Sequence, residues 1–162
     1  MGFGLPAAIG AALAHPRRKV VCISGDGSIL MNIQELATLA ELELDVSVFV
    51  LNNQHLGLVR QQQEFFYGGR HYASAFQRGP EFAAIAEAFG IIGVDMARSS
   101  HRERTLEAAL TLAGPSLIDV PIPAMENVIP MVPPGAANTV RVERAPAGVF
   151  GSVATKRACR VS

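Results

Sequence analysis

Residues 20–28 have the sequence VVCISGDGS, and residues 46–53 have the sequence VSVFVLNN. Each is a short run of mainly apolar, β-branched residues that ends in turn-forming residues, which is typical of a strand buried in a sheet. Between them, apolar residues recur on one face of residues 33–42, and Asn32 and Glu35 have the spacing of a capping box. A strand, a helix and a second strand of these lengths predict a βαβ unit with parallel strands.

The same alternation continues along the chain. The further elements that we predict are helices over residues 6–14, 60–67, 81–89 and 102–113, and strands over residues 91–96 and 116–121. The rest of residues 54–79 is expected to form a long surface loop, and loops of this length are often functional lids. The predicted fold class is therefore α/β, with a parallel sheet of at least four strands sandwiched by helices.

The C-terminal end has a different composition. Residues 130–134 include three prolines, which favour an extended segment. Residues 140–162 contain five Lys or Arg residues and one acidic residue, without hydrophobic periodicity. We therefore predict one domain over residues 1–139 and an irregular basic tail over 140–162, either frayed or serving as a binding arm.

Composition excludes several classes of protein. The 162 residues include 14 Lys or Arg and 14 Asp or Glu, so the balanced charge does not indicate a nucleic-acid partner. Two cysteines, Cys22 and Cys159, are too few for a disulfide framework or a zinc ribbon. The apolar stretch at residues 2–14 is too short to span a membrane, and no Lys or Arg precedes it as in a signal peptide. We expect a buried helix there, no membrane association and a cytoplasmic location.

Two loops are candidates for binding chemistry. The first, Gly25-Asp26-Gly27-Ser28, ends a predicted strand, and its glycines would let the backbone approach a phosphate closely, although Asp-Gly is also common in ordinary turns. Asn53 follows Asp26 by 27 residues, so a βαβ unit would bring both to the carboxyl edge of the sheet. Carboxylate and amide oxygens suit Mg²⁺ or Ca²⁺ better than zinc. The spacing therefore predicts a site for Mg²⁺ and a diphosphate group.

These residues resemble the diphosphate-binding signature of thiamine diphosphate enzymes. Four longer stretches resemble the acetolactate synthase (acetohydroxyacid synthase) family, namely MGFGLPAAIG at 1–10, MNIQELAT at 31–38, LNNQHLG at 51–57 and PMVPPGAANT at 130–139. The resemblance covers about residues 1–139 and implies the C-terminal cofactor-binding domain of the catalytic large subunit. That family condenses pyruvate, after decarboxylation, with a second 2-oxo acid in branched-chain amino acid biosynthesis.

The resemblance also implies roles for individual residues. Mg²⁺ would be held by Asp26, by the side chain of Asn53 and by the main-chain oxygen of His55. Met1 would lie under the thiazolium ring and keep the cofactor bent. The whole expected cofactor-binding set is Met1, Gly25, Asp26, Gly27, Ser28, Asn53, His55, Leu56, Gly57 and Leu58.

The chain also departs from the family. Members are much longer, and the glutamate that activates the cofactor lies in an N-terminal domain, while FAD sits mostly on a middle domain. We therefore expect no catalytic residue in this chain, no FAD site of its own and no activity of the chain alone. Glu35 is interpreted as a helix cap and not as the missing glutamate. Gln62 stands where many relatives carry a tryptophan that favours 2-oxobutyrate, so that preference is not expected.

Partners follow from the same resemblance. The family glutamate comes from the partner subunit, so a homodimer or a complementing domain is expected, with a regulatory small subunit as a further possible partner. Three alternatives remain open at the level of sequence. The chain could be the cofactor subunit of a split thiamine diphosphate-dependent 2-oxo acid decarboxylase, an inactive truncated domain, or a different small-molecule site on the same architecture.

Overall fold

A computed structural model describes residues 1–144 of the chain. Its elements, in chain order, are α1 (Gly4–Ala14), β1 (Val20–Gly25), α2 (Asp26–Ile29), the 3₁₀ helix η1 (Ile33–Glu35), α3 (Leu36–Glu41), β2 (Val46–Asn52), α4 (Gly57–Phe66), α5 (Phe82–Ala88), β3 (Ile92–Asp95), the 3₁₀ helix η2 (Met96–Arg98), α6 (Arg102–Thr111) and β4 (Ser116–Pro121). No helix among these residues is long and apolar enough to cross a membrane.

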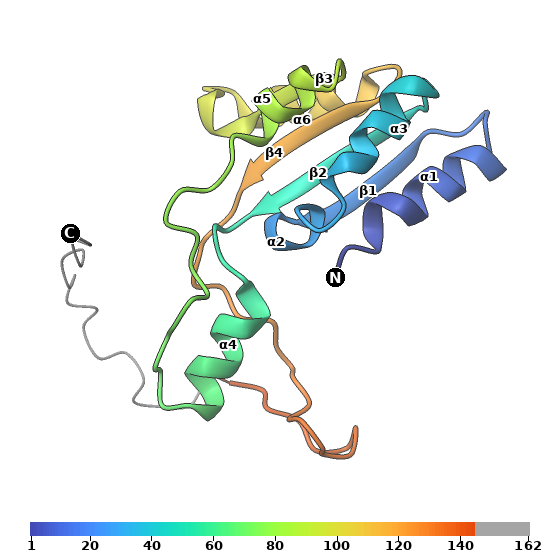
Figure 1. The fold of residues 1–162 in the computed structure, drawn as a ribbon. Helices are drawn as coiled ribbons and strands as arrows, with labels where there is room; N and C mark the ends of the chain where they lie inside the picture. The colour runs from blue at the N-terminus through green and yellow to red at the C-terminus, as the bar shows by residue number, and fades with distance from the viewer. Residues whose placement is uncertain (145–162) are drawn as a thin grey trace, which may run out of the picture.

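The four strands form one parallel sheet in the order β1-β2-β4-β3 (Figure 1). Gly25 at the end of β1 pairs in register with Leu51, and Asn52 at the end of β2 pairs with Pro121 at the end of β4. The carboxyl ends of these three neighbouring strands therefore meet at one edge of the sheet. This confirms the predicted α/β class and the predicted neighbouring positions of the first two strands.

The larger core lies on one face of the sheet, under α1, α3 and α5. Val48, Leu117 and Leu36 are fully buried in it, and Phe82 and Ala86 of α5 pack against the same cluster. Alternate residues of each strand point to this face, so the period of two explains which side chains are buried.

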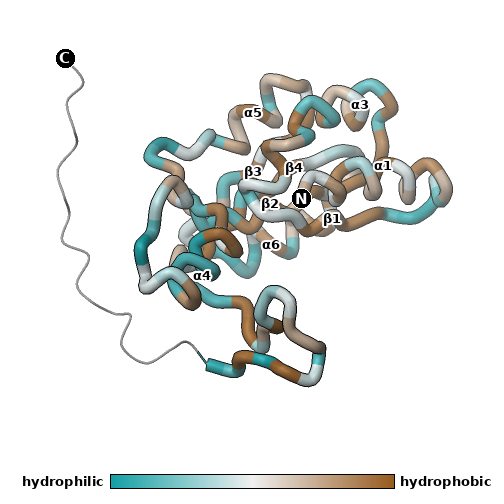
Figure 2. The backbone as a smooth tube through the Cα atoms, turned by 60° about the horizontal axis from the view of Figure 1, so that its bottom comes forward, coloured by the Kyte–Doolittle hydropathy of each residue, from teal (hydrophilic) through white to brown (hydrophobic). Residues whose placement is uncertain are grey.

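The other face is covered over one half only. There α6 and η2 pack on β4 and β3 around Phe49, Met96 and Ile118. Over β1, the same face leaves Ile23 68% exposed. The hydrophobic strand β1 pairs with β2 alone and lies along the rim of the sheet (Figure 2).

Most predicted elements are confirmed with small shifts at their ends. The strand over 116–121 has the predicted bounds, and Pro6 lies in the first turn of α1. Gly90 ends α5 in a left-handed conformation (φ +80°), as expected for a glycine after a helix. The short helix predicted from residue 60 begins earlier, at Gly57, so it follows the Asn53 loop almost directly.

The predicted capping box is wrong. The Asn32 side chain accepts no capping hydrogen bond, because the segment first makes the 3₁₀ turn η1. A Cβ on Gly2 would lie 2.3 Å from Asn32 Oδ1, so this oxygen lies against the N-terminal loop instead. The Glu35 carboxylate accepts a hydrogen bond from Thr38 Oγ1 at 3.2 Å, one turn further along the chain. The Asn32 side chain therefore lies beside Gly2 and does not cap the helix.

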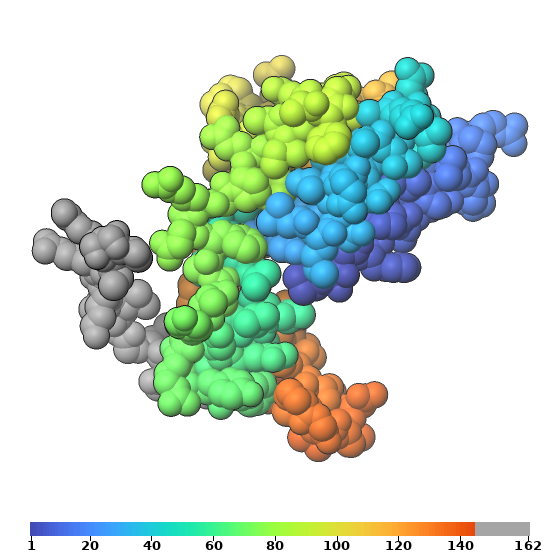
Figure 3. All heavy atoms as spheres, viewed as in Figure 1, coloured from blue at the N-terminus to red at the C-terminus, as the bar shows by residue number. Residues whose placement is uncertain are grey.

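A second lobe lies beyond the carboxyl edge of the sheet. It consists of α4 and the segment 122–144, which descends from β4 and is drawn in orange in Figures 1 and 3. Met131 and Val142 form an antiparallel bridge within it. The predicted basic tail begins at residue 140, so its first five residues belong to this lobe and its remaining residues, 145–162, lie outside the described part of the chain.

Candidate functional site

A cavity of about 500 Å³ opens at the carboxyl ends of β1, β2 and β4, between the sheet and α4. It is lined by all ten residues expected to bind the cofactor: Met1, Gly25, Asp26, Gly27, Ser28, Asn53, His55, Leu56, Gly57 and Leu58. Residues up to 57 positions apart in the sequence thus meet in one place. The position agrees with the rule that open parallel sheets bind ligands outside the carboxyl ends of their strands.

With Glu126, Asp26 is one of the charged residues that line this cavity. The residue is only 3% exposed, and its Oδ1 atom accepts a hydrogen bond from the Gly27 N–H at 2.7 Å. Its Oδ2 atom is buried and has no hydrogen-bond partner in the described structure. A buried carboxylate oxygen without a partner is costly, and a cation would satisfy it.

Gly27 is needed because the cavity wall comes very close to its backbone. A Cβ at this position would lie 2.7 Å from the Leu56 side chain and 3.6 Å from the terminal methyl group of Met1. The Gly2 N–H donates a hydrogen bond to Ser28 Oγ at 3.0 Å, which ties the N-terminal loop to the same turn. Met1, placed in this site by the sequence resemblance, therefore lies beside the Gly27 turn.

Asn53 and His55 form the second arm of the site. The His55 N–H donates to Asn53 Oδ1 at 3.1 Å, and the His55 Nδ1 atom lies 2.9 Å from the main-chain oxygen of Asn53, to which it donates. Gln54 between them has a positive φ of 55°. The His55 ring thus stabilises the turn formed by residues 53–55. A Cβ on Gly57 would lie 3.0 Å from the Asn53 amide nitrogen, so α4 begins tightly against this arm.

The residues present fit a magnesium ion shared with a ligand. Asp26 offers an unpaired carboxylate oxygen, and Asn53 and His55, which line the same cavity, carry further hard oxygen atoms in an amide and in the main chain. Within residues 1–144 no group of three or more His, Cys, Asp or Glu residues could hold a metal. Few protein ligands with open positions are typical of Mg²⁺ that also binds substrate phosphates.

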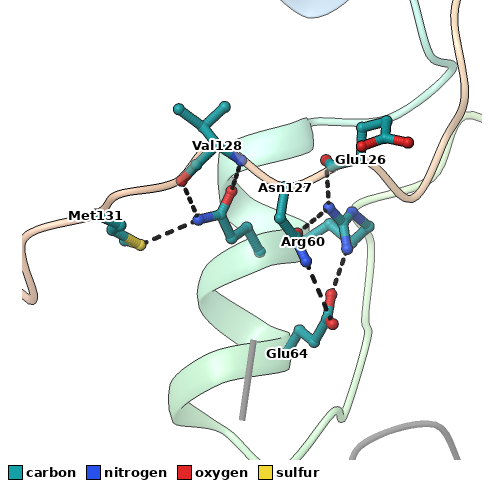
Figure 4. A network of polar contacts seen from close by, with 7 residues as sticks. Arg60, Glu64, Glu126, Asn127, Val128 and Met131 are labelled. Atoms are coloured by element: carbon teal, nitrogen blue, oxygen red, sulfur yellow. Dashed lines mark hydrogen bonds and ion pairs between the residues drawn. The ribbon is translucent and has the colours of Figure 1, made fainter. Parts of the chain in front are cut away.

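The α4 wall of the cavity is held by polar side chains that the sequence did not single out (Figure 4). The Gln61 amide donates to the Val128 carbonyl oxygen at 2.8 Å and accepts from the Val128 N–H at 2.7 Å. Arg60, 1% exposed, donates to the Glu126 carbonyl oxygen at 2.9 Å and to Asn127 Oδ1 at 2.6 Å. These contacts fix residues 126–128 opposite the Asp26 loop.

The charge of Arg60 is balanced inside the lobe. Its guanidinium forms an ion pair with Glu64, which is also buried, and the Asn127 amide donates to Glu64 at 3.5 Å. Asn127 lies more than 60 residues from both Arg60 and Glu64, so no local pattern indicates its contacts with them. The rule that places ligands at the carboxyl edge does predict that Ile122 and Pro123, just after β4, line the cavity, as they do.

A smaller cavity of about 290 Å³ lies on the other side of the end of β2. Asp119 of β4, Asp95 of β3 and Asn52 line it. Burial raises the pKa of Asp119, and the nearby charges of Asp95 and Asp26 raise it further, while a hydrogen bond from Asn52 lowers it. Sequence analysis did not single out Asp119 or Asp95.

Other residues considered in the sequence lie away from the main cavity. Gln62 is exposed and lines a separate surface hollow with Val59 and Tyr67. Cys22 is buried, and burial raises the pKa of its thiol. Cys159 lies outside the described residues. His15 is exposed, as are His71 and His101.

Comparison with known proteins gives a consistent result. Residues 1–120 match the family described as thiamine pyrophosphate enzyme, C-terminal TPP binding domain. The chain is 52% identical over 142 residues to the acetolactate synthase isozyme 1 large subunit of Escherichia coli strain K12, covering 88% of this chain and 25% of that protein. It is 46% identical over 144 residues to the isozyme 2 large subunit of the same organism, covering 89% and 26%.

A third relative, from another organism, is as similar as the first. The chain is 52% identical over 143 residues to the acetolactate synthase large subunit of Parasynechococcus marenigrum strain WH8102, covering 88% of this chain and 23% of that protein. The chain thus spans about a quarter of the length of these relatives. The match over residues 1–120 and the cavity built by those residues lead to one conclusion: the chain belongs to the thiamine pyrophosphate enzymes, through their C-terminal TPP-binding domain.

Proposed function

We propose that this chain is the Mg²⁺- and diphosphate-binding part of an acetolactate synthase, which condenses pyruvate, after decarboxylation, with a second 2-oxo acid. One observation carries the proposal. The buried Asp26 carboxylate has an oxygen without a partner and lines a cavity with Asn53 and His55. This occurs in a chain 52% identical to an acetolactate synthase large subunit over most of its length.

In this proposal the Asp26 carboxylate, the Asn53 amide oxygen and the His55 main-chain oxygen hold Mg²⁺. The main-chain N–H groups around Gly27 and Gly57 would be open to the diphosphate, because neither residue has a side chain to keep it away. When bound, thiamine diphosphate supplies the electron sink for decarboxylation and carbon–carbon bond formation.

The apolar wall orients the reactive end of the cofactor. Met1, Leu56 and Leu58 line the cavity beside the Asp26 loop, and Val128 lines it from the segment 126–128. These side chains form an apolar part of the cavity wall, where they would exclude water. Met1, beside Gly27, would hold the cofactor in the bent form that the sequence resemblance implies.

The remaining parts of the catalyst lie outside this chain in the proposal. The activating glutamate and the FAD-binding region belong to other domains, and a second subunit completes the site. A homodimer or a complementing domain, and a regulatory small subunit, are the partners expected in the cytoplasm. We expect the purified chain to form no acetolactate from pyruvate, Mg²⁺ and thiamine diphosphate.

Calorimetric titration of the purified chain with thiamine diphosphate, with and without Mg²⁺, tests the binding role. We expect binding only with Mg²⁺, and its loss in Asp26→Asn, which keeps an acceptor for the Gly27 N–H but removes the charge that holds the metal.

Asp95→Asn is the matched control, since this carboxylate lies at the same sheet edge but lines the smaller cavity. The control variant should bind like the unmodified chain. Binding that is independent of Mg²⁺, or that survives in Asp26→Asn, would contradict the assigned role of Asp26.

A further inference from the structure

The turn that carries Asn53 is fastened to the neighbouring strand through the residue before it. Asn52 uses three of its polar groups for this purpose. Its side-chain oxygen accepts from the Gln54 N–H at 3.2 Å, and its main-chain oxygen accepts from the Ile122 N–H at 3.0 Å, just beyond β4. Its side-chain amide donates to Asp119 Oδ2 at 3.3 Å. Two of the three contacts thus come from β4 or its continuation.

Asp119 fixes which way the Asn52 side chain points. If the amide were turned over, its NH₂ group would face the Gln54 N–H, and its oxygen would face the Asp119 carboxylate. Both contacts would then be repulsive. The carboxylate therefore selects the orientation that closes the turn around Asn53.

The turn needs such support because its backbone is strained. Gln54 has a left-handed conformation with φ 55°, which side-chain-bearing residues adopt only when their surroundings hold them there. Its N–H is bound by Asn52 and its carbonyl oxygen accepts from the Phe76 N–H at 2.9 Å. Without the Asn52 contact, one of these two restraints is lost, and Asn53 lies directly between Asn52 and Gln54.

We propose that Asp119 is a positioning residue for the metal site: by orienting Asn52, it holds the strained turn that presents Asn53 and His55 to the cavity. This inference rests on the proposed function, since it concerns the Mg²⁺ that Asn53 is proposed to bind. Asp119 itself lines the smaller cavity and is not assigned as a ligand or a catalytic residue.

The test is a reversal of the Asn52–Asp119 hydrogen bond. Asp119→Ala should lower the Mg²⁺-dependent affinity for thiamine diphosphate by about tenfold, the effect of one lost hydrogen bond. Asn52→Asp should lower it at least as much, because two carboxylates then face each other. Adding Asp119→Asn to Asn52→Asp should restore the affinity to within about threefold, since the new amide can donate to the new carboxylate while the Gln54 N–H keeps its acceptor.

Two controls separate positioning from other effects. Asp95→Asn removes a carboxylate from the same edge without touching Asn52, and should leave the affinity unchanged. Asp119→Asn alone should also retain near-normal affinity, because its amide oxygen can still accept from Asn52. If Asp119 acted through its charge, Asp119→Asn would bind thiamine diphosphate as weakly as Asp119→Ala does. That result would overturn the proposal.

Hydrogen exchange provides a readout that needs no ligand. The Gln54 amide should exchange faster in Asp119→Ala than in the unmodified chain, and should regain protection in the reversed pair. Unchanged Gln54 exchange in Asp119→Ala, or a reversed pair no better than Asn52→Asp alone, would overturn the positioning role.

If the unmodified chain binds no Mg²⁺ and cofactor, the proposed function fails, and the exchange of Gln54 still decides whether Asp119 orders the turn. If Asp119→Ala does not fold, the comparison of Asn52→Asp with the reversed pair decides.

Discussion

The sheet core and the α4 lobe bury opposite kinds of side chain, although both form walls of the same cavity. Under α1, α3 and α5, the core consists of apolar residues such as Leu36, Val48 and Leu117. In the lobe, the side chains buried between α4 and residues 126–128 are Arg60, Gln61 and Glu64. Apolar packing tolerates small shifts, whereas each polar contact here requires one partner in one place.

The outer surfaces of the two regions differ in the same way. The lobe buries the polar face of α4 and leaves the apolar side chains Leu58, Val59 and Phe66 largely exposed. The sheet is thus stabilised by apolar side chains whose spacing can be read from the local sequence. The second wall of the cavity is stabilised by polar contacts between residues that are far apart in the sequence. A destabilising substitution in the lobe should therefore affect the lobe alone, whereas one in the sheet core should destabilise the whole described fold.

Arg60→Ala should have the largest effect, and it should be confined to the lobe. The substitution leaves the buried Glu64 carboxylate without its charged partner, at a cost of about 3–5 kcal/mol. Amides of α4 and of residues 126–131 should lose protection from hydrogen exchange, while those of β1 and β2 keep theirs.

The paired substitution Arg60→Met with Glu64→Gln should cost much less, because it leaves no buried charge alone. Equal losses in the single and paired variants would show that the ion pair is not what holds the lobe. Loss of protection throughout the sheet would contradict the separation of the two regions.

Leu36→Ala should destabilise the whole described fold. Leu36 is fully buried in the main core, and the cavity left by the substitution should lower the free energy of unfolding by about 2–5 kcal/mol. Urea unfolding followed by far-ultraviolet circular dichroism measures this change. Leu36→Met, which conserves volume, should cost less than about 1.5 kcal/mol; a similar loss for both would indicate that the site does not depend on close packing.

Gln61→Glu should loosen only the segment opposite the Asp26 loop. The new carboxylate cannot donate to the Val128 carbonyl oxygen, and the contact should weaken by about 1–3 kcal/mol. Faster exchange of the Val128 amide would reveal it. Gln62→Glu is the matched control, because Gln62 is the next residue of α4 and is exposed. An equal change in both variants would argue against the Gln61–Val128 contact.

The pH dependence of stability should show a small contribution from Asp119. Burial raises its pKa in the folded chain above the ordinary value of 3.8, so the folded state holds this proton more tightly than the unfolded state. The contribution of Asp119 to stability is therefore present at low pH and is lost as the pH rises from about 3.8 through the raised pKa. Unfolding curves at several pH values should show a shallower decline in Asp119→Asn. An unchanged slope would mean that Asp119 does not have the raised pKa.

The contrast between the apolar sheet core and the polar contacts of the lobe explains which features could be predicted from the sequence. The strands, the parallel sheet and the meeting of the Asp26 and Asn53 loops follow from periodicity and from the length of the βαβ unit, and all ten expected cofactor residues line one cavity. The contacts of Arg60 and Gln61 with residues 126–131 did not follow, because these partners lie 66 or more residues away in the sequence. The capping box failed because Asn32 contacts residue 2, a relation that local spacing does not contain.

The location of the metal tests the central claim most directly. Mn²⁺ replaces Mg²⁺ at sites of hard oxygen ligands and broadens the nuclear magnetic resonance signals of nearby residues. In the presence of thiamine diphosphate, substoichiometric Mn²⁺ should broaden the amide signals of residues 26–28 and 53–57 first, and those around Asp95 much less. Broadening centred on Asp95 and Asp119, or none near Asp26, would contradict the assignment of the cofactor site to the carboxyl ends of β1 and β2.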